Sequence, residues 1–301
     1  MKDRFKQGMV MTICAGIAWG FSGNCAEILF KNFGITPVYL SSMRMVFSGL
    51  ILTIAALLTN RENLISMLKD KRSVLQLVLF ALFGILFNQV SYLEAINNSN
   101  SGTATILQYI GPVFCMITEC ILIKRLPTKK EVSAIMLAMI GTFILATHGD
   151  IHRIYLTPLG LMWGLFAAFA IVFYTFIPIK LIGKYGAIPV TGCAMLIGGA
   201  VTSTYSKAFL QPFNTNPKFI ALLVLIILLG TIVSYTLYLM GIDRCGPVVA
   251  SMLASIEPVS ATVFMVILLN VPFTGIEAVG FACIFVTVFI LAKSKTSNSN
   301  K

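Results

Sequence analysis

The chain has 301 residues, of which 57% are hydrophobic and only 11% are charged, and its mean hydropathy is +0.90. Because soluble domains carry about 25% charged residues, this composition excludes an ordinary water-soluble domain and, with it, a Rossmann-type enzyme or a nucleic-acid-binding domain. The net charge of +11 is then a matter of membrane topology, since Lys and Arg gather on the cytoplasmic side of membrane proteins.

Apolar runs of about 20 residues, bounded by charged residues or by Gly, Pro and Asn, predict membrane-spanning helices. Ten such runs are present, which leave no room for a sizeable soluble domain beside them. In chain order they cover residues 8–30, 38–58, 74–96, 103–122, 132–148, 157–181, 188–209, 219–241, 247–269 and 275–292. A proline at a helix start costs no hydrogen bond, and such positions are held by Pro37, Pro158, Pro189 and Pro247.

The distribution of Lys and Arg predicts the orientation of these spans. With the N-terminus in the cytoplasm, 17 of the 22 basic residues fall in inner loops and tails, four fall in outer loops, and Arg44 alone lies within a span. This excess is typical of an even number of spans with both ends in the cytoplasm. We therefore expect an all-α integral membrane protein with ten transmembrane helices and cytoplasmic termini.

The two halves of the chain resemble each other at spacings of 144 and 146 residues. The matched pairs are Trp19 with Trp163, Tyr92 with Tyr238, Ala104 with Ala250, and Pro112 with Pro258. Because each half holds five helices, the second enters the membrane in the opposite sense, which makes an inverted repeat. Secondary transporters often have this architecture, with the substrate site at the repeat interface near the bilayer midplane. We expect a first repeat over residues 1–150, a second over 151–293, and a disordered cytoplasmic tail over 294–301.

Several motifs stand in the same order in the two halves. They are Trp19-Gly20, Arg44, Tyr92-x-x-Ala95 and Pro112 in the first half, and Trp163-Gly164, Tyr238-x-x-Gly241 and Glu257-Pro258 in the second. This set resembles the ten-helix EamA family of the drug/metabolite transporter superfamily over nearly the whole chain. The Gly-Glu pairs usual after the family's fourth and ninth helices are replaced by Lys124-Arg125 and Asn270-Val271. The resemblance implies a multi-pass plasma-membrane carrier for small organic solutes, commonly an exporter of amino acids or related metabolites, with some proton-driven relatives.

Glu257 is the carboxylate that lies deepest in a predicted span, near the middle of the ninth. Polar atoms inside a bilayer are costly, so an intramembrane carboxylate is a functional candidate. Burial disfavours the charged form of a carboxyl group, and two roles follow: an anchor for a cationic group of the solute, or a proton-coupling site. The alternative is a structural glutamate hydrogen-bonded to the facing half.

The fourth span carries a polar stripe at helical spacing, formed by Thr105, Gln108, Tyr109, Pro112, Cys115 and Glu119. Pro112 and Pro258 each remove a main-chain donor at membrane depth, which is tolerated where the helix is buried or lines a wet cavity. Both prolines are therefore candidate helix breaks, with a packed kink as the alternative.

Aromatic walls with a few hydrogen-bonding groups would hold an amphipathic solute, and an amine could make cation–π contacts there. The two tryptophans are equally compatible with close packing beside glycine. The predicted binding or coupling residues are Glu257, Trp163, Tyr235, Tyr238, Asn88, Tyr92, Gln108, Tyr109, Trp19 and Tyr174.

Three charged residues fall in the outer third of the first three spans: Glu27, Arg44 and Glu94. An unpaired Arg at that depth would be costly. We therefore expect Arg44 to pair with one or both acids as an extracellular gate, with a static pair as an alternative. Glu27 has a further local alternative, an i,i+4 contact with Lys31.

The sequence gives no support to enzymatic chemistry. The seven cysteines have no C-x-x-C spacing and mostly lie in predicted spans, as small core residues do. His148 and His152 lie in an outer loop and do not predict a metal site. Walker, GxSxG and HExxH motifs are absent, so we expect no catalytic residue, cofactor or metal.

The sequence thus predicts a secondary active transporter that moves an amino acid or related metabolite by alternating access, with export favoured and proton coupling as an option. A multidrug or cationic-compound efflux carrier is an open alternative, and a solute sensor or intramembrane enzyme is an alternative of another class. The expected partners are a small-molecule substrate, protons in the coupled case, and the lipid bilayer, with no nucleic acid. The chain would act as a monomer or homodimer.

Overall fold

The computed structural model describes residues 2–99, 101–147, 150, 152, 157–269 and 275–298, and every regular element in these ranges is a helix. The helices of the first half are α1 (Lys2–Phe33), α2 (Pro37–Thr59), α3 (Arg61–Lys69), α4 (Lys71–Leu79), η1 (Phe80–Leu86), α5 (Phe87–Asn97), α6 (Ser101–Gln108), α7 (Gly111–Leu122) and α8 (Lys129–Thr147). Those of the second half are α9 (Pro158–Phe176), α10 (Ile179–Tyr185), α11 (Ala187–Ser206), η3 (Ala208–Leu210), α12 (Pro217–Ile227), η4 (Leu228–Val233), α13 (Ser234–Cys245), α14 (Pro247–Leu253), α15 (Ile256–Leu269) and α16 (Gly275–Asn298).

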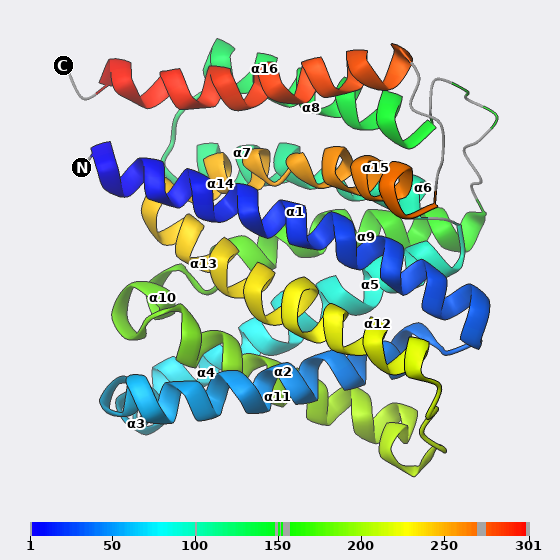
Figure 1. Ribbon diagram of the computed structural model, residues 1–301. Helices are drawn as coiled ribbons and strands as arrows, with labels where there is room; N and C mark the ends of the chain where they lie inside the picture. Colours follow the sequence, from blue (N-terminus) through cyan, green and yellow to red (C-terminus); the bar gives the residue numbers. More distant parts are fainter. Residues whose placement is uncertain are drawn as a thin grey trace.

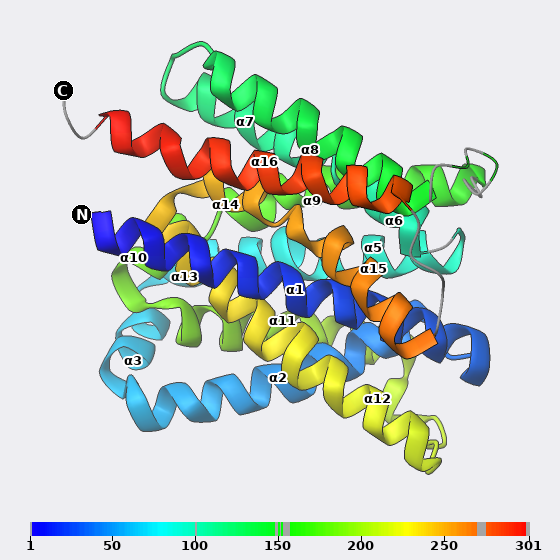
Figure 2. The same cartoon turned by 45° about the horizontal axis from the view of Figure 1, so that its top comes forward.

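The helices form one bundle, and the two termini lie at the same end of it (Figure 1). The halves contact each other reciprocally: α2 packs against α11, α8 against α16, α1 against α13, and α5 against α9. Figure 2 shows α1 of the first half between α13 and α15 of the second. Helix one of each half thus meets the third span of the other half, which is the arrangement that two-fold related repeats produce. The two-repeat architecture expected from the sequence therefore fits the fold.

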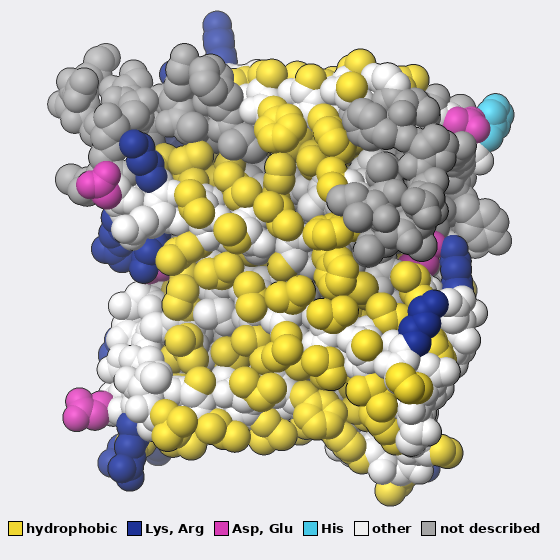
Figure 3. All heavy atoms as spheres, viewed as in Figure 1, with side chains coloured by type: hydrophobic (Ala, Val, Ile, Leu, Met, Phe, Trp, Pro, Cys, Tyr) yellow, Lys and Arg dark blue, Asp and Glu magenta, His cyan; other side chains and the backbone are white. Residues whose placement is uncertain are grey.

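Eight helical stretches in the described residues are long and apolar enough to cross a membrane. They correspond to eight of the ten predicted runs, and the remaining two runs correspond to α8 and α16. Figure 3 shows hydrophobic side chains across the middle of one face and charged side chains toward the two ends of the helices. This distribution is typical of helices that run across a bilayer. The short helix α3, between the second and third spans, was not expected.

Two of the spans are interrupted near their middle. The break between α6 and α7 and the break between α14 and α15 occur at equivalent positions of the two repeats. Pro112 and Pro258 stand in the first turn of α7 and of α15. Because proline has no N–H, it cannot donate the hydrogen bond that would continue the preceding helix, α6 or α14. In the first turn of a helix no such donor is needed, so α7 and α15 can begin there.

The third and eighth spans each contain a π-helical stretch, η1 and η4, again at equivalent positions. Such stretches are rare and are frequently found at functional sites. They lie directly before α5 and α13, which supply several of the polar side chains between the two halves.

Some predicted features lie at or beyond the limits of the described residues. Helix α16 continues to Asn298, and residues 299–301 lie outside the described ranges. Asn270-Val271 and His148 also lie outside them. The disordered tail and the boundaries of the repeats therefore stay predictions.

Candidate functional site

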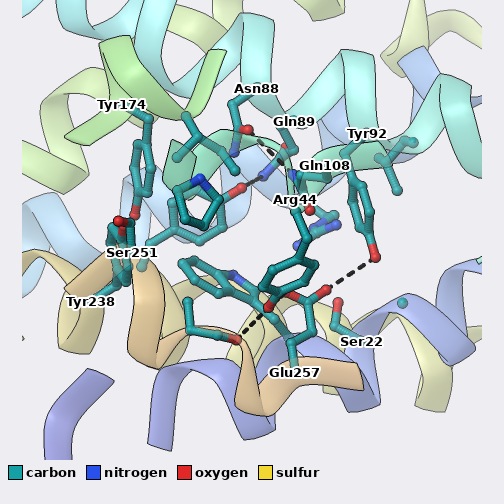
Figure 4. A pocket seen from close by; sticks show the side chains of 18 residues that line it. Ser22, Arg44, Asn88, Gln89, Tyr92, Gln108, Tyr174, Tyr238, Ser251 and Glu257 are labelled. Atoms are coloured by element: carbon teal, nitrogen blue, oxygen red, sulfur yellow. Dashed lines mark hydrogen bonds between the residues drawn. The ribbon is translucent and has the colours of Figure 1, made fainter. Parts of the chain in front are cut away.

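A cavity of about 60 Å³ lies between the two halves of the chain (Figure 4). Helices α1, α2, α5, α6 and α7 line it from the first half, and α9, α13, α14 and α15 line it from the second. Nine of the ten predicted binding or coupling residues line it: Trp19, Asn88, Tyr92, Gln108, Tyr109, Tyr174, Tyr235, Tyr238 and Glu257. Arg44 and Pro112 line it as well, whereas Trp163, Glu27, Glu94 and Pro258 do not.

The Glu257 carboxyl group is held in this cavity by two tyrosines from the other half. Glu257 is only 5% exposed and is the second residue of α15, directly after the break. The Tyr92 hydroxyl donates to Oε1 at 3.1 Å, and the Tyr109 hydroxyl lies 3.4 Å from Oε2. Tyr109 also donates to the main-chain carbonyl of Ala254. Within the described residues no Lys or Arg forms an ion pair with Glu257, so the carboxyl meets only neutral donors.

The Trp-Gly motif of α1 explains how α15 comes so close to the cavity. A Cβ added at Gly20 would lie 2.0 Å from the Ser260 Oγ and 2.4 Å from the Glu257 main-chain oxygen. Only glycine permits this approach, which sets α15 directly against α1. The neighbouring Trp19 lines the same cavity as Glu257.

Four aromatic rings form one wall of the cavity. The Trp19 ring centroid lies 6.4, 5.4 and 5.1 Å from those of Tyr174, Tyr235 and Tyr238, and Tyr174 stacks on Tyr238 at 5.4 Å. The Tyr238 hydroxyl is 3.2 Å from the Thr175 hydroxyl. The buried Tyr174 hydroxyl has no hydrogen-bond partner among the described residues. The wall therefore combines π faces, which attract cations, with a free hydroxyl.

Arg44 connects the second span to the π-helical stretch of the eighth. It is 4% exposed, its Nε donates to the Thr231 hydroxyl at 2.9 Å, and its Nη2 donates to the Gly230 carbonyl at 2.9 Å. Both acceptors belong to η4. Two N–H groups of this buried guanidinium thus bind neutral acceptors and not a carboxylate.

The predicted gate pair between Arg44 and the acids Glu27 and Glu94 is not formed in this structure. Glu27 instead binds Lys31 at 2.6 Å, which is the local i,i+4 alternative. Glu94 binds the side chain of Asn98 at 3.2 Å. The prediction assumed that a buried Arg needs a carboxylate, but the acceptors of η4 satisfy it.

Trp163 is the one predicted binding residue outside the cavity. It is partly buried, packs on an apolar cluster, and lies 5.8 Å from Phe166 between ring centroids. The adjacent Gly164 faces Leu107, whose Cδ1 would lie 2.4 Å from an added Cβ. The motif therefore serves close packing in the second half, which was the alternative for this tryptophan.

The prediction missed Gln89, which lines the cavity and is buried. Its Nε2 lies 3.5 Å from the Tyr235 hydroxyl, and its Oε1 has no hydrogen-bond partner among the described residues. Gln89 and Tyr235 are 146 residues apart, so equivalent positions of the two repeats meet each other. A buried amide inside a predicted span is itself a signal that could have identified it. The other polar lining residues missed are Ser22 and Ser251.

Comparison with known proteins gives matches along nearly the whole chain. The sequence model of the EamA-like transporter family matches residues 6–147 and 158–293. The "Uncharacterized inner membrane transporter YicL" of Salmonella typhimurium is 31% identical over 287 residues, which cover 95% of each protein. An "Uncharacterized transporter" of Archaeoglobus fulgidus is 20% identical over 279 residues and covers 92% of this chain and 95% of the relative. One crystal structure shares the fold, with a TM-score of 0.75 at 17% identity over 95% of this chain and 96% of the other.

These matches confirm the resemblance seen in the sequence motifs and the expected plasma-membrane location. The family and the names of the relatives indicate a transporter rather than an enzyme. A transporter of this family implies a small-molecule substrate and a lipid environment. The chain is a multi-pass plasma-membrane protein and belongs to the EamA-like transporter family.

Proposed function

We propose that the chain is a secondary active transporter that moves a small organic solute by alternating access. Its ten spans would form two inverted five-helix repeats, with both termini in the cytoplasm. The observation that supports this most directly is the cavity built from both halves around Glu257. Interrupted helices beside a central site are typical of secondary transporters, and both interruptions border this cavity.

The cavity is too small to hold an organic solute in this structure. About 60 Å³ holds only a few water molecules, since one needs about 10–15 Å³ on the same measure. A solute can therefore enter only if helices of the two halves move apart. Alternating access supplies such a movement, because one half rocks against the other around the central site.

The lining favours a solute with an ammonium group, such as an amino acid or a related metabolite, with export as the direction. Glu257 offers a carboxyl without a cationic partner in the described residues. The wall of Trp19, Tyr174, Tyr235 and Tyr238 offers π faces for the same charge. Arg44 lies in the same cavity and would suit a carboxylate at the other end of the solute. In the proton-coupled form of the proposal, Glu257 binds either a proton or the ammonium group.

A second candidate is efflux of bulkier cationic compounds. The observation that favours it is the aromatic wall, because the π faces of its rings attract cations of different shapes. The two candidates differ in their dependence on Arg44, because only a zwitterionic solute uses the guanidinium.

The test is uptake and counterflow of labelled amino acids, amines and organic cations in proteoliposomes of the purified protein. The Glu257→Gln variant is expected to abolish transport or its pH dependence. The control is Glu62→Gln, because Glu62 is exposed on α3 and outside the cavity. Unchanged rates at every pH in Glu257→Gln would remove this residue from the mechanism. Absence of flux for every solute class in the unmodified protein would contradict the transporter proposal.

A further inference from the structure

A row of hydrogen-bonded oxygen atoms leads from Glu257 toward the end of the bundle away from both termini. The Tyr92 hydroxyl lies 3.1 Å from Glu257 Oε1 and 3.1 Å from the Thr105 Oγ1. The Thr105 Oγ1 lies 2.7 Å from the carbonyl oxygen of Ser101, the first residue of α6. The main-chain N–H of Ser101 donates to Glu27 Oε2 at 3.2 Å.

The outer end of this row reaches solvent. Ser101 is partly exposed, and the Glu27 side chain is 22% exposed. Glu27 also binds Lys31, whose side chain is 68% exposed. The row thus begins at a buried carboxyl and ends beside an exposed one.

The number of hydroxyl protons in the row shows which protonation state of Glu257 allows every contact to be a hydrogen bond. Three contacts link Glu257, Tyr92, Thr105 and the Ser101 carbonyl, but Tyr92 and Thr105 supply only one hydroxyl proton each. All three contacts are hydrogen bonds at once only if the Glu257 carboxyl supplies the third proton. While Glu257 is ionised, Tyr92 donates to its carboxylate, as described above. When Glu257 is protonated this bond reverses: Glu257 donates to Tyr92, Tyr92 donates to Thr105, and Thr105 donates to the Ser101 carbonyl.

We propose that this row is the path by which Glu257 exchanges its proton with the solvent at the end of the bundle away from the termini. This inference rests on the proposed role of Glu257 as a proton site. In one transfer the O–H bond of Glu257 breaks as the Tyr92 oxygen takes its proton, and the Tyr92 proton passes to the Thr105 oxygen. The Thr105 proton passes to a water molecule beside Ser101. One hydronium ion results, its proton is accepted by the Glu27 carboxylate or the bulk solvent, and no electrons are transferred.

The other groups that face Glu257 do not continue to an exposed acid within the described residues. Arg44 ends on η4, and Tyr109 ends on the Ala254 carbonyl. The remaining titratable groups of the cavity come from α9 and α13, and their contacts stay inside the bundle: Tyr174, Tyr235 and Tyr238. Tyr92 is therefore the neighbour of Glu257 that leads outward.

Among the described residues, the second repeat has no direct contact equivalent to the one between the Tyr92 and Thr105 hydroxyls. The positions equivalent to Tyr92 and Thr105 are Tyr238 and Ser251, at a spacing of 146. Tyr238 binds the Thr175 hydroxyl, while Ser251 donates to the Val248 carbonyl of its own helix. In an inverted repeat an equivalent row would lead to the opposite end, so the direct contact between Tyr92 and Thr105 distinguishes the first repeat from the second.

The test uses Trp19 as a reporter, because it lines the same cavity as Glu257 and the chain has only one other tryptophan. In a Trp163→Phe background, the fluorescence of Trp19 is followed by stopped flow after a pH jump in nanodiscs. We expect a component that Glu257→Gln abolishes. Thr105→Val should slow this component by about tenfold or more, since each 1.4 kcal/mol of barrier is tenfold in rate, and should keep its final amplitude.

The matched control is Thr191→Val, because the Thr191 hydroxyl is also buried and binds the carbonyl four residues earlier in its own helix, α11. It should leave the rate unchanged. Tyr92→Phe should slow the component as Thr105→Val does. Equal rates in Thr105→Val, Tyr92→Phe and the background would overturn the proton path while leaving the role of Glu257 intact. Absence of any Glu257-dependent component in the background would instead contradict proton exchange at Glu257 itself, which the transport assay measures separately.

Discussion

The Tyr109 hydroxyl donates a hydrogen bond to the main-chain carbonyl of Ala254, and so joins the break of one span to the break of its repeat-related partner. Pro258 explains why this carbonyl is available, because proline lacks the N–H that would bind it from the next turn. The bond has no counterpart in the other direction. The residue equivalent to Tyr109 is Ser255, whose short side chain donates to Met252 within its own segment at 2.6 Å.

We predict that Tyr109→Phe weakens the contact between the two halves while keeping the ring in place. The Ala254 carbonyl retains its bond from the Glu257 N–H at 2.9 Å but loses the hydroxyl donor. The expected loss is about 1 kcal/mol in the free energy of unfolding, measured by denaturation in mixed micelles. Tyr205→Phe is the control, since Tyr205 is 81% exposed and should tolerate the change. Equal stability of the two variants would contradict the assigned role of the hydroxyl.

A second prediction concerns the close approach of α1 and α15. Gly20→Ala would place a methyl group 2.0 Å from the Ser260 Oγ and 2.4 Å from the Glu257 carbonyl oxygen. Because the helix backbone must shift to accommodate it, we expect a loss of about 1–3 kcal/mol in the free energy of unfolding. We also expect impaired transport, since Glu257 moves with its helix.

The control for this substitution is Gly183→Ala in α10. An added Cβ there would come no closer than 4.0 Å to the nearest side-chain atom. Alanine also favours a helix more than glycine does, so this variant should be as stable as the parent or slightly more so. If Gly20→Ala behaved in the same way, the packing argument for the Trp-Gly motif would be wrong.

The sequence predicts the cavity well because of the energetics of polar atoms in lipid. Asn88, Gln108 and Glu257 lie at the middle of apolar spans, where a polar side chain must meet other protein groups or a wet cavity. This requirement predicts that polar side chains from different spans lie close together, even when their individual contacts are not known. Tyr109 followed from the polar stripe of the fourth span.

The repeat was a poorer guide to individual side chains. Trp19 and Trp163 are equivalent in sequence, yet only Trp19 lines the cavity. Glu257 has Gly111 as its equivalent at a spacing of 146. Internal similarity therefore predicts backbone architecture, whereas the environment of a side chain depends on neighbours that differ between the halves.

The partners of Arg44 could not be predicted, because they lie in a π-helical stretch and no pattern in the sequence indicated that stretch. Charge alone directed the prediction to Glu27 and Glu94. The acceptors are instead a hydroxyl and a carbonyl of η4.

A third prediction follows from this geometry. Arg44→Lys keeps the positive charge, but one ammonium group cannot reproduce the two separate contacts of a planar guanidinium. We expect a loss of about 1.5–3 kcal/mol in the free energy of unfolding, as for a hydrogen bond to a charged group. The control is Arg61→Lys, at an exposed position of α3. Equal unfolding curves for the two variants would show that the contacts with η4 contribute nothing to stability.

A fourth prediction concerns Asp70, which lies before α4 at the end of the bundle that holds the termini and contacts α10 of the second half. Hydrogen bonds from the Ser73 hydroxyl at 2.8 Å and then from Lys184 at 3.3 Å lower the pKa of Asp70 from 3.8 to about 2. A lowered pKa in the folded protein stabilises it above pH 3.8, and this contribution disappears as the pH falls through about 2. Asp70→Asn keeps a helix-capping side chain but loses the charge, so it should melt at a lower temperature than the parent at pH 7, and the difference should vanish near pH 2. The control is Asp3→Asn, at an exposed position of α1. A gap between Asp70→Asn and the parent that persists below pH 2 would contradict the contribution of the charge.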